Sequence, residues 1–206
     1  PVEPQVHVQD EAARGVRLDH VRVRPVVPAE REASGRRVGG SSRPNRAGIF
    51  LHVGRGPEAD VLVAISGSGS VSGLVSVNLG GTLSFTGGGR VNRVTVNSGG
   101  TVSLPGNGVA TNLTFASTGN LTFDFSTSNT VGSLTVIDAN GITNNGAANS
   151  VTINLTGALP ANGTYTLISY SGSLGGSGFG AYQLGTAPVG KNYALVNTVG
   201  AVQLTV

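Results

Sequence analysis

The sequence predicts an all-β protein: a parallel β-helix (solenoid) with rungs of about 19 residues and a C-terminal β-rich capping module. Residues 75–85, 94–104 and 113–123 read VSVNLGGTLSF, VTVNSGGTVSL and LTFASTGNLTF, so three similar copies follow one another at a constant step. Each copy alternates apolar and small polar residues, the period of strands with one face on a core. A glycine in each copy permits a sharp turn between two strands. A fixed internal period of this length is typical of solenoids.

The alignment of the three copies predicts which side chains point inward. Glycine recurs at 81, 100 and 119, and Ser or Thr falls between the apolar positions. Asn78 and Asn97 match beside the turn, where stacked amides can hydrogen-bond along the stack. Like side chains would then lie above one another, about 4.7–4.9 Å apart. The matching apolar positions are Val75, Val94 and Leu113; Val77, Val96 and Phe115; Leu83, Val102 and Leu121; and Phe85, Leu104 and Phe123.

Composition divides the chain near residue 60. Residues 1–60 hold 10 of the 13 basic residues, 8 of the 10 acidic residues and all three histidines, whereas residues 61–206 hold 26 of the 33 glycines and every threonine. We therefore expect an Arg/Pro-rich leader over 1–60 that is mostly disordered or unrelated to the rest, with no fixed fold over 1–48. The β-solenoid repeats are expected over 61–149 and a C-terminal β-strand module over 150–206.

The repeat becomes less regular in spacing and sequence towards the C-terminus. Leu134–Ile137, which follows Leu113 at slightly more than the repeat spacing, is expected to be the next copy. Larger aromatic side chains and hairpin-like spacing then predict a module that covers the open end of the stack. Its expected strands are 150–157, 164–172, 181–185, 192–198 and 200–206, with turns at 160–163 and 199–200.

Charge, cysteine content and hydropathy exclude several classes of function. The formal net charge of +3 is small and scattered, which argues against a nucleic-acid partner. The chain has no cysteine, so it has neither disulfides nor thiolate metal ligands. Its longest strongly apolar stretch, Val61–Ile65, is far shorter than the roughly 20 residues of a membrane helix, so no membrane insertion is expected within this fragment.

Two glycine-rich segments resemble ligand-binding motifs only in part. Residues 185–192, GTAPVGKN, match the start of a phosphate-binding loop, but Pro188 removes a donor and Asn192 replaces the Ser/Thr. A turn that contains Lys191 is the better interpretation. Residues 175–180, GGSGFG, have Gly180 where a calcium-binding repeat has Asp, so we expect a mobile glycine loop without calcium.

The residue inventory predicts no catalytic, cofactor-binding or metal-binding residue, no cofactor and no enzyme activity. Glycoside hydrolysis generally needs two neighbouring carboxylates, and we expect Asp124 and Asp138 not to share a cleft. Arg90 and Arg93 are expected to form a solvated turn that keeps an edge soluble, and not a cluster that binds sugar acids. The histidines lack the spacing of a metal site. They are His7, His20 and His52.

Four N-x-T sequons occur in the β region, at Asn112, Asn120, Asn154 and Asn162. A chain this rich in Asn and Thr produces such triplets by chance, and in a bacterial protein we expect them to be unmodified.

The repeated pattern V-x-V-N-x-G-G-T-L/V-S-F/L is followed by GALPANGTYTLISYSGSLGGSGF and YALVNTVGAVQLTV. Over about residues 66–206 it resembles the autotransporter-associated β-strand repeat (passenger-type) proteins of bacteria. The resemblance implies a parallel β-helix at the cell surface or outside the cell. It carries over no catalytic or binding residue.

These observations favour a non-enzymatic structural or adhesive segment of an exported bacterial surface protein. Its partner stays open between surface glycans and other surface proteins. The alternative is a carbohydrate-binding β-module, in which polar ladders and tyrosines would hold a glycan. The tyrosines alternate with apolar residues as core positions do, which argues against aromatic platforms. They are Tyr165, Tyr170, Tyr182 and Tyr193.

Overall fold

The computed structural model describes residues 21–22, 48–53 and 61–206, which form two β-sheets and one turn of 3-10 helix. Sheet A runs in the order β1-β4-β6-β8-β11-β14-β18-β17, and β12 and β15 extend it. Sheet B runs in the order β16-β13-β9-β7-β5-β3-β2, with β10 paired to β9. The elements are β1 (Val21–Arg22), β2 (Gly48–Val53), β3 (Val61–Ser66), β4 (Ser70–Val77), β5 (Gly81–Phe85), β6 (Gly89–Val96), β7 (Gly100–Leu104), β8 (Gly108–Phe115), β9 (Gly119–Thr127), β10 (Thr130–Val131), β11 (Leu134–Ala139), β12 (Ile142–Asn144), β13 (Val151–Gly157), β14 (Thr164–Ser171), β15 (Gly175–Gly176), η1 (Gly178–Ala181), β16 (Tyr182–Leu184), β17 (Ala194–Thr198) and β18 (Ala201–Thr205).

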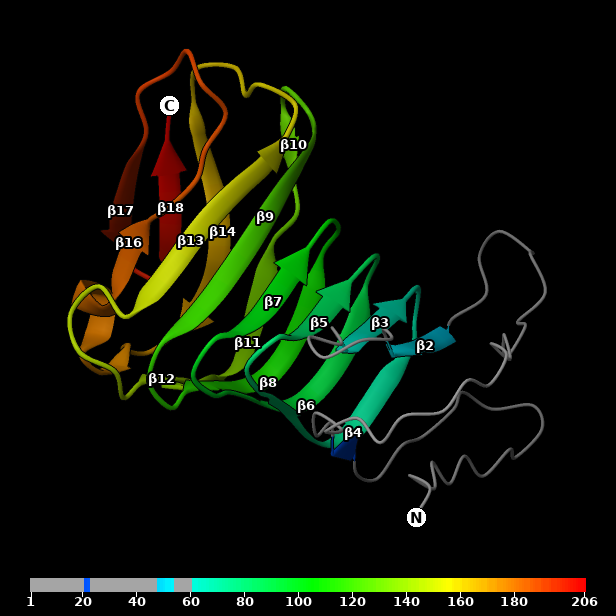
Figure 1. Cartoon of the computed structure of the whole chain (residues 1–206). Helices are drawn as coiled ribbons and strands as arrows, with labels where there is room; N and C mark the ends of the chain where they lie inside the picture. Colours follow the sequence, from blue (N-terminus) through cyan, green and yellow to red (C-terminus); the bar gives the residue numbers. More distant parts are fainter. Residues whose placement is uncertain (1–20, 23–47, 54–60) are drawn as a thin grey trace, which may run out of the picture.

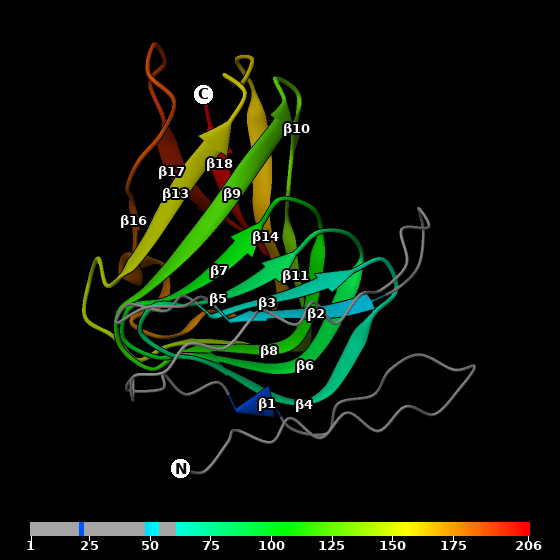
Figure 2. The same cartoon turned by 45° about the vertical axis from the view of Figure 1, so that its right-hand side comes forward.

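From β3 to β9 the chain alternates between the two sheets, so that consecutive strands lie in opposite layers (Figures 1 and 2). Short turns make this alternation. In two of them Gly81 N and Gly100 N donate to Asn78 O and Asn97 O, at 2.8 and 2.9 Å. The residues before them, Gly80 and Gly99, have φ of 72° and 73°, a conformation that glycine adopts without steric cost.

The strands that the repeat predicts pair in parallel, with the register that the alignment of the copies predicts. Val77 is aligned with Val96, and Val96 with Phe115, and these three side chains are 4%, 0% and 0% exposed. They form one inward column, as the sequence predicts, because every second side chain of a strand lies on the same face. The arrangement is all-β with parallel sheet strands, and it is compatible with a β-helix.

After β9 the register changes, and one sequence-based alignment is wrong. Leu134 pairs with Gly108, whereas Leu113 pairs with Ile142. The physical reason is that β9 continues to Thr127 and returns as an antiparallel hairpin with β10. The chain therefore uses extra residues before it re-enters sheet A, and β8 is matched by two strands, β11 and β12.

The five strands predicted beyond Ser150 are all present, as β13, β14, β16, β17 and β18. Strand β13 pairs in parallel with β9 along its whole length, so sheet B continues through the expected boundary near residue 150. Strands β17 and β18 form the predicted hairpin, with its turn at Val199–Gly200, and β18 is antiparallel to β14. Sheet A thus ends in antiparallel strands at the C-terminal end of the stack (Figure 1).

Most of the predicted leader, residues 1–60, lies outside the described residues. Within the described part, β1 pairs in parallel with β4 and β2 pairs antiparallel with β3. The expectation that 1–48 has no fixed fold therefore falls almost entirely on residues outside that part.

A single apolar core fills the space between the two sheets. Among its largest fully buried side chains are Phe85, Phe115, Phe123 and Phe125. Complete burial of each such side chain stabilises the fold by about 1.5–3 kcal/mol before entropy is counted. The outward positions of β5 are Thr82 and Ser84, and those of β9 are Asn120, Thr122 and Asp124.

Candidate functional site

The outer face of sheet B carries two columns of hydroxyl and amide side chains. They arise because each strand places its polar positions opposite those of its neighbours, and alternate residues of a strand lie on the same face. The parallel pairs of this sheet show no register shift, whereas β4/β6 and β11/β14 in sheet A do. The columns are Thr82, Thr101, Asn120, Thr152 and Gln183, and Ser84, Ser103, Thr122 and Asn154. Ser84 is buried, and the other members are half-buried or exposed.

Hydrogen bonds involve three of these side chains, at the C-terminal end of the columns. Gln183 Nε2 donates to Thr152 Oγ1 at 3.3 Å. Asn154 Oδ1 accepts from both the backbone N and the Oγ1 of Thr186, at 3.0 Å each. The outer face of sheet B is therefore a regular array of hydroxyl and amide groups, with the carboxylate of Asp124 on the same face of β9.

Sheet A carries one similar column, and a second ladder lies at the turns. The outward residues Ser76, Thr95 and Thr114 are aligned across β4, β6 and β8. At the turn, Asn97 Nδ2 donates to Asn78 Oδ1 at 2.7 Å, which confirms the predicted amide stacking.

The two aspartates of the β region lie on different sheets. Asp124 is on β9 of sheet B, where its Oδ1 accepts from Thr156 Oγ1 at 3.0 Å. Asp138 is on β11 of sheet A and is exposed. The two carboxylates therefore come from opposite layers of the molecule.

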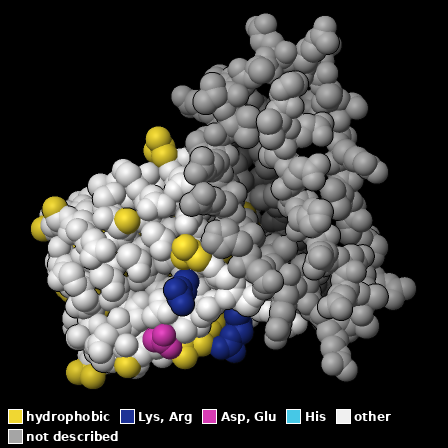
Figure 3. Space-filling view, turned by 90° about the horizontal axis from the view of Figure 1, so that it is seen from below, with side chains coloured by type: hydrophobic (Ala, Val, Ile, Leu, Met, Phe, Trp, Pro, Cys, Tyr) yellow, Lys and Arg dark blue, Asp and Glu magenta, His cyan; other side chains and the backbone are white. Residues whose placement is uncertain are grey.

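The prediction that Arg90 and Arg93 form a turn at an edge is wrong. Both are exposed, but they lie within β6, which is flanked by β4 and β8 in sheet A. The three glycines before Arg90 suggest a turn, yet the last of them, Gly89, is buried and starts the strand. A register shift opposite, between Val71 and Leu74, bends the pairing there. Among the described residues on the face that Figure 3 shows, few side chains are charged.

The two glycine-rich segments have different outcomes. Residues 185–192 form a loop with a turn at Val189–Gly190, as predicted, and strand β17 follows. In that loop Lys191 Nζ donates to Asn162 Oδ1 at 2.5 Å. Residues 175–180, expected to be a mobile loop, instead form β15 and most of η1, because β15 pairs with β12.

The alternation predicts core positions for the tyrosines, but only Tyr182 is buried, and the other three are half-buried against the core. Tyr182 is 6% exposed, and burial raises its pKa to about 12, with a smaller opposing effect from the Asn144 side chain. The hydroxyl of Tyr165 donates to Ser128 O and Ala161 O at 3.0 and 2.9 Å. The hydroxyls of Tyr170 and Tyr193 donate to Asn197 Oδ1 and Pro188 O.

The sequons and histidines add no site in the described residues. Asn112, Asn120 and Asn154 lie within strands, and Asn162 lies in the bend before β14. His7 and His20 lie outside the described residues, and His52 is on β2. The part of the chain that the structure describes contains no group of three or more His, Cys, Asp or Glu that could hold a metal ion.

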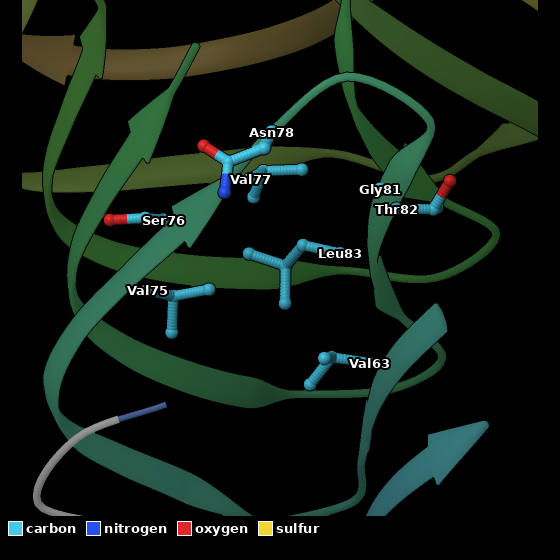
Figure 4. Close-up of a pocket in the computed structure, with 8 residues that line it drawn as sticks. All are labelled: Val63, Val75, Ser76, Val77, Asn78, Gly81, Thr82 and Leu83. Atoms are coloured by element: carbon cyan, nitrogen blue, oxygen red, sulfur yellow. The ribbon is translucent and has the colours of Figure 1, made fainter. Parts of the chain in front are cut away.

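A small recess lies between β3, β4 and β5, and Figure 4 shows its lining. The aliphatic side chains of Val63, Val75, Val77 and Leu83 point towards one another across it. None of its lining residues is titratable, so the recess offers packing surface and no reactive group.

None of the described residues forms a helix of the length and apolar character that a membrane crossing requires. Comparison of the chain with protein-family models, curated proteins and solved structures gave no match.

Proposed function

We propose that this chain is a non-enzymatic structural or adhesive segment of an exported bacterial surface protein, and that it acts as a rigid spacer displaying polar faces. The observation that carries the proposal is the in-register array of hydroxyl and amide side chains on sheet B, held by a continuous apolar interior. Because the strands beneath these side chains are held in register, the positions of the side chains on the face are preorganised for contact with another polar surface.

We further propose that the two sheets are the walls of a parallel β-helix with rungs of about 19 residues, ended by a C-terminal β-rich cap. The constant register of β4 to β9 supports the rungs, and the β17–β18 hairpin supports the cap. The location at the cell surface or outside the cell, and a surface glycan or surface protein as partner, come from the resemblance to autotransporter-associated repeat proteins.

Deletion of one rung tests the solenoid. Removing residues 82–100 joins Gly81 to Thr101, so that Gly81, the first residue of β5, takes the place of Gly100, the first residue of β7. We expect this variant to keep cooperative urea unfolding, and small-angle scattering to show a stack shorter by about 4.7–4.9 Å. As the matched control, removal of residues 91–100 joins Arg90 of sheet A directly to Thr101 of sheet B and should abolish cooperative unfolding. Loss of the fold in the first variant would contradict the solenoid.

Adhesion is tested with the full chain immobilised on beads and exposed to bacterial cells and to an array of surface glycans. Replacing Thr101 and Thr152 by lysine disrupts the sheet B array, whereas replacing Thr95 and Thr114 by lysine is the matched change on sheet A. We expect bead capture to fall at least tenfold with the first pair and to change little with the second. If the chain cleaves a glycan, or if one soluble oligosaccharide binds through the tyrosines, the proposal gives way to an enzyme or to a carbohydrate-binding module.

A further inference from the structure

The inward column of sheet A changes character at the end of β12. Val77, Val96 and Phe115 are followed in register by Asn144, which pairs with Phe115 and is 0% exposed. The Nδ2 of Asn144 donates to Gly178 O at 2.9 Å, but its Oδ1 has no hydrogen-bond partner. A buried amide oxygen without a hydrogen-bond partner destabilises the fold, so a hydrogen-bond donor is expected near this atom.

Tyr182 brings a second polar atom to the same place. Its ring is in the core, and its hydroxyl is buried without a hydrogen-bond partner. The Asn144 side chain lies close enough to lower the pKa of this hydroxyl through a hydrogen-bond interaction, yet no bond of normal geometry joins the hydroxyl or Asn144 Oδ1 to a partner.

Ser150 contributes the third buried polar atom. Its Oγ is also buried without a partner, in the bend that joins β12 to β13. A Cβ placed on Gly146 would lie 2.3 Å from that Oγ, so the bend folds back closely on itself. The next residue, Val151, pairs with Tyr182, which places Ser150 next to the start of β16.

We propose that Asn144, Ser150 and Tyr182 bind one internal water molecule. Asn144 Oδ1 only accepts hydrogen bonds, whereas the two hydroxyls can donate or accept. Water can donate to the amide oxygen while it accepts from a hydroxyl, and buried waters typically make about three such bonds. All three protein groups are neutral, whereas hard cations in proteins generally take carboxylate ligands.

The water site has a structural consequence for the end of the stack. The three residues come from β12, the bend before β13, and β16, which belong to both sheets. Shared hydrogen bonds between them fix how the last strands sit on the stack. An apolar column would permit a shifted register at this point, whereas a satisfied buried polar network permits only one.

A crystal structure of the full chain, together with water oxygen-17 relaxation dispersion in solution, tests the site. We expect electron density for one water within hydrogen-bond distance of at least two of the three atoms. We also expect Tyr182→Phe to lose one long-lived water from the solution count. Tyr170→Phe removes a hydroxyl that is bonded to Asn197 Oδ1 outside this site and should leave the count unchanged.

Three results would overturn the proposal. The first is a direct hydrogen bond from the Tyr182 hydroxyl to Asn144 Oδ1, with no density between them. The second is a metal ion at the position of the water. The third is the same number of long-lived waters in Tyr182→Phe as in the unmodified chain. If Tyr182→Phe does not fold, the crystal structure of the unmodified chain decides between the first two results and the proposed water.

Discussion

The strands from β4 to β9 and those from β11 to β18 pair and pack against the core in different ways. In the first region, paired residues of neighbouring parallel strands are one repeat apart in sequence throughout sheet B and in most of sheet A. These strands bury an apolar interior. In the second, partners lie further apart in sequence, as in the pair Gly119 and Val151, and antiparallel strands appear. All three buried polar atoms without partners in the described residues belong to the second region.

This difference shows two sources of structural specificity. In the repeats, each strand needs only the local alternation of apolar and polar residues, because its neighbours repeat the same pattern. In the C-terminal region, individual contacts hold unlike segments together. Tyr165 shows this best: its hydroxyl donates to two carbonyls, and its ring packs edge-on against Phe125 at a centroid distance of 5.0 Å.

The largest expected effect comes from a charge in the repeat core. Val96 is 0% exposed on β6, so Val96→Asp buries a carboxylate between Val77 of β4 and Phe115 of β8 and loses apolar contact. We expect a loss of several kcal/mol, on the order of half the stability of a small domain.

The adjacent Thr95→Asp is the matched control, because Thr95 is on the outer face of the same strand. It should cost about 1 kcal/mol or less. Urea midpoints of the two variants decide the matter. Equal destabilisation would show that the inward and outward assignments of β6 are wrong.

The next largest effect is a pH dependence in the C-terminal region. The folded-state pKa of Tyr182 is raised to about 12 from an ordinary value of 10.0, because burial disfavours the phenolate. The free energy of unfolding therefore has its full value below pH 10, since the Tyr182 phenol is then protonated in both the folded and the unfolded state. It falls as pH rises from 10 to 12, because the unfolded state loses its proton first, and the loss amounts to roughly 3 kcal/mol.

Urea unfolding at pH 9 and pH 11.5 measures this dependence. Tyr182→Phe removes the titrating group, so its stability should fall less over the same interval. The other tyrosines stay in both proteins and cancel in the comparison. An identical pH slope in the two proteins would argue against a buried Tyr182 hydroxyl.

Sequence alone predicted the repeats well for a physical reason. The positions of Val77, Val96 and Phe115 follow from a period of two within strands and a constant step between copies, and both are visible in the residues. The five strands after Ser150 were also predictable, since each alternates and is bounded by turn residues.

The remaining features depend on contacts that no local pattern encodes. The pairing of Leu134 with Gly108 depends on how far β9 extends before it turns back. Arg90 looks like a turn residue because three glycines precede it, yet neighbouring strands hold it in a sheet. Asn144 was inconspicuous in sequence, because only its pairing with β8 and its contact with η1 make it an interior residue.

A smaller effect tests the tight turns of the repeats against the open bend before β14. A Cβ on Gly100 would lie 2.4 Å from Val77 O, so Gly100→Ala must displace backbone at the end of β4. We expect a loss of about 1–3 kcal/mol.

Gly163→Ala is the control, because its Cβ would make only ordinary contacts, the nearest at 3.9 Å from Tyr165. It should be neutral or stabilise the protein by up to about 1 kcal/mol through the unfolded state. Thermal unfolding midpoints of the two variants measure the difference. An unchanged midpoint in Gly100→Ala would mean that this turn packs less tightly against β4 than the structure shows.

The smallest expected effect separates the amide ladder from the core that supports it. Asn97 Nδ2 donates to Asn78 Oδ1 at 2.7 Å, and this bond links the turn after β6 to the turn after β4. Asn97→Ala and Asn78→Ala should each cost about 0.5–1 kcal/mol, since both partners are partly solvated and water replaces much of the lost bond. The double variant should cost less than the sum of the two, because either substitution alone already removes the shared bond. Urea unfolding of all four proteins measures this coupling. Strictly additive losses would show that the two amides act independently, and that the apolar columns alone keep the turns in register.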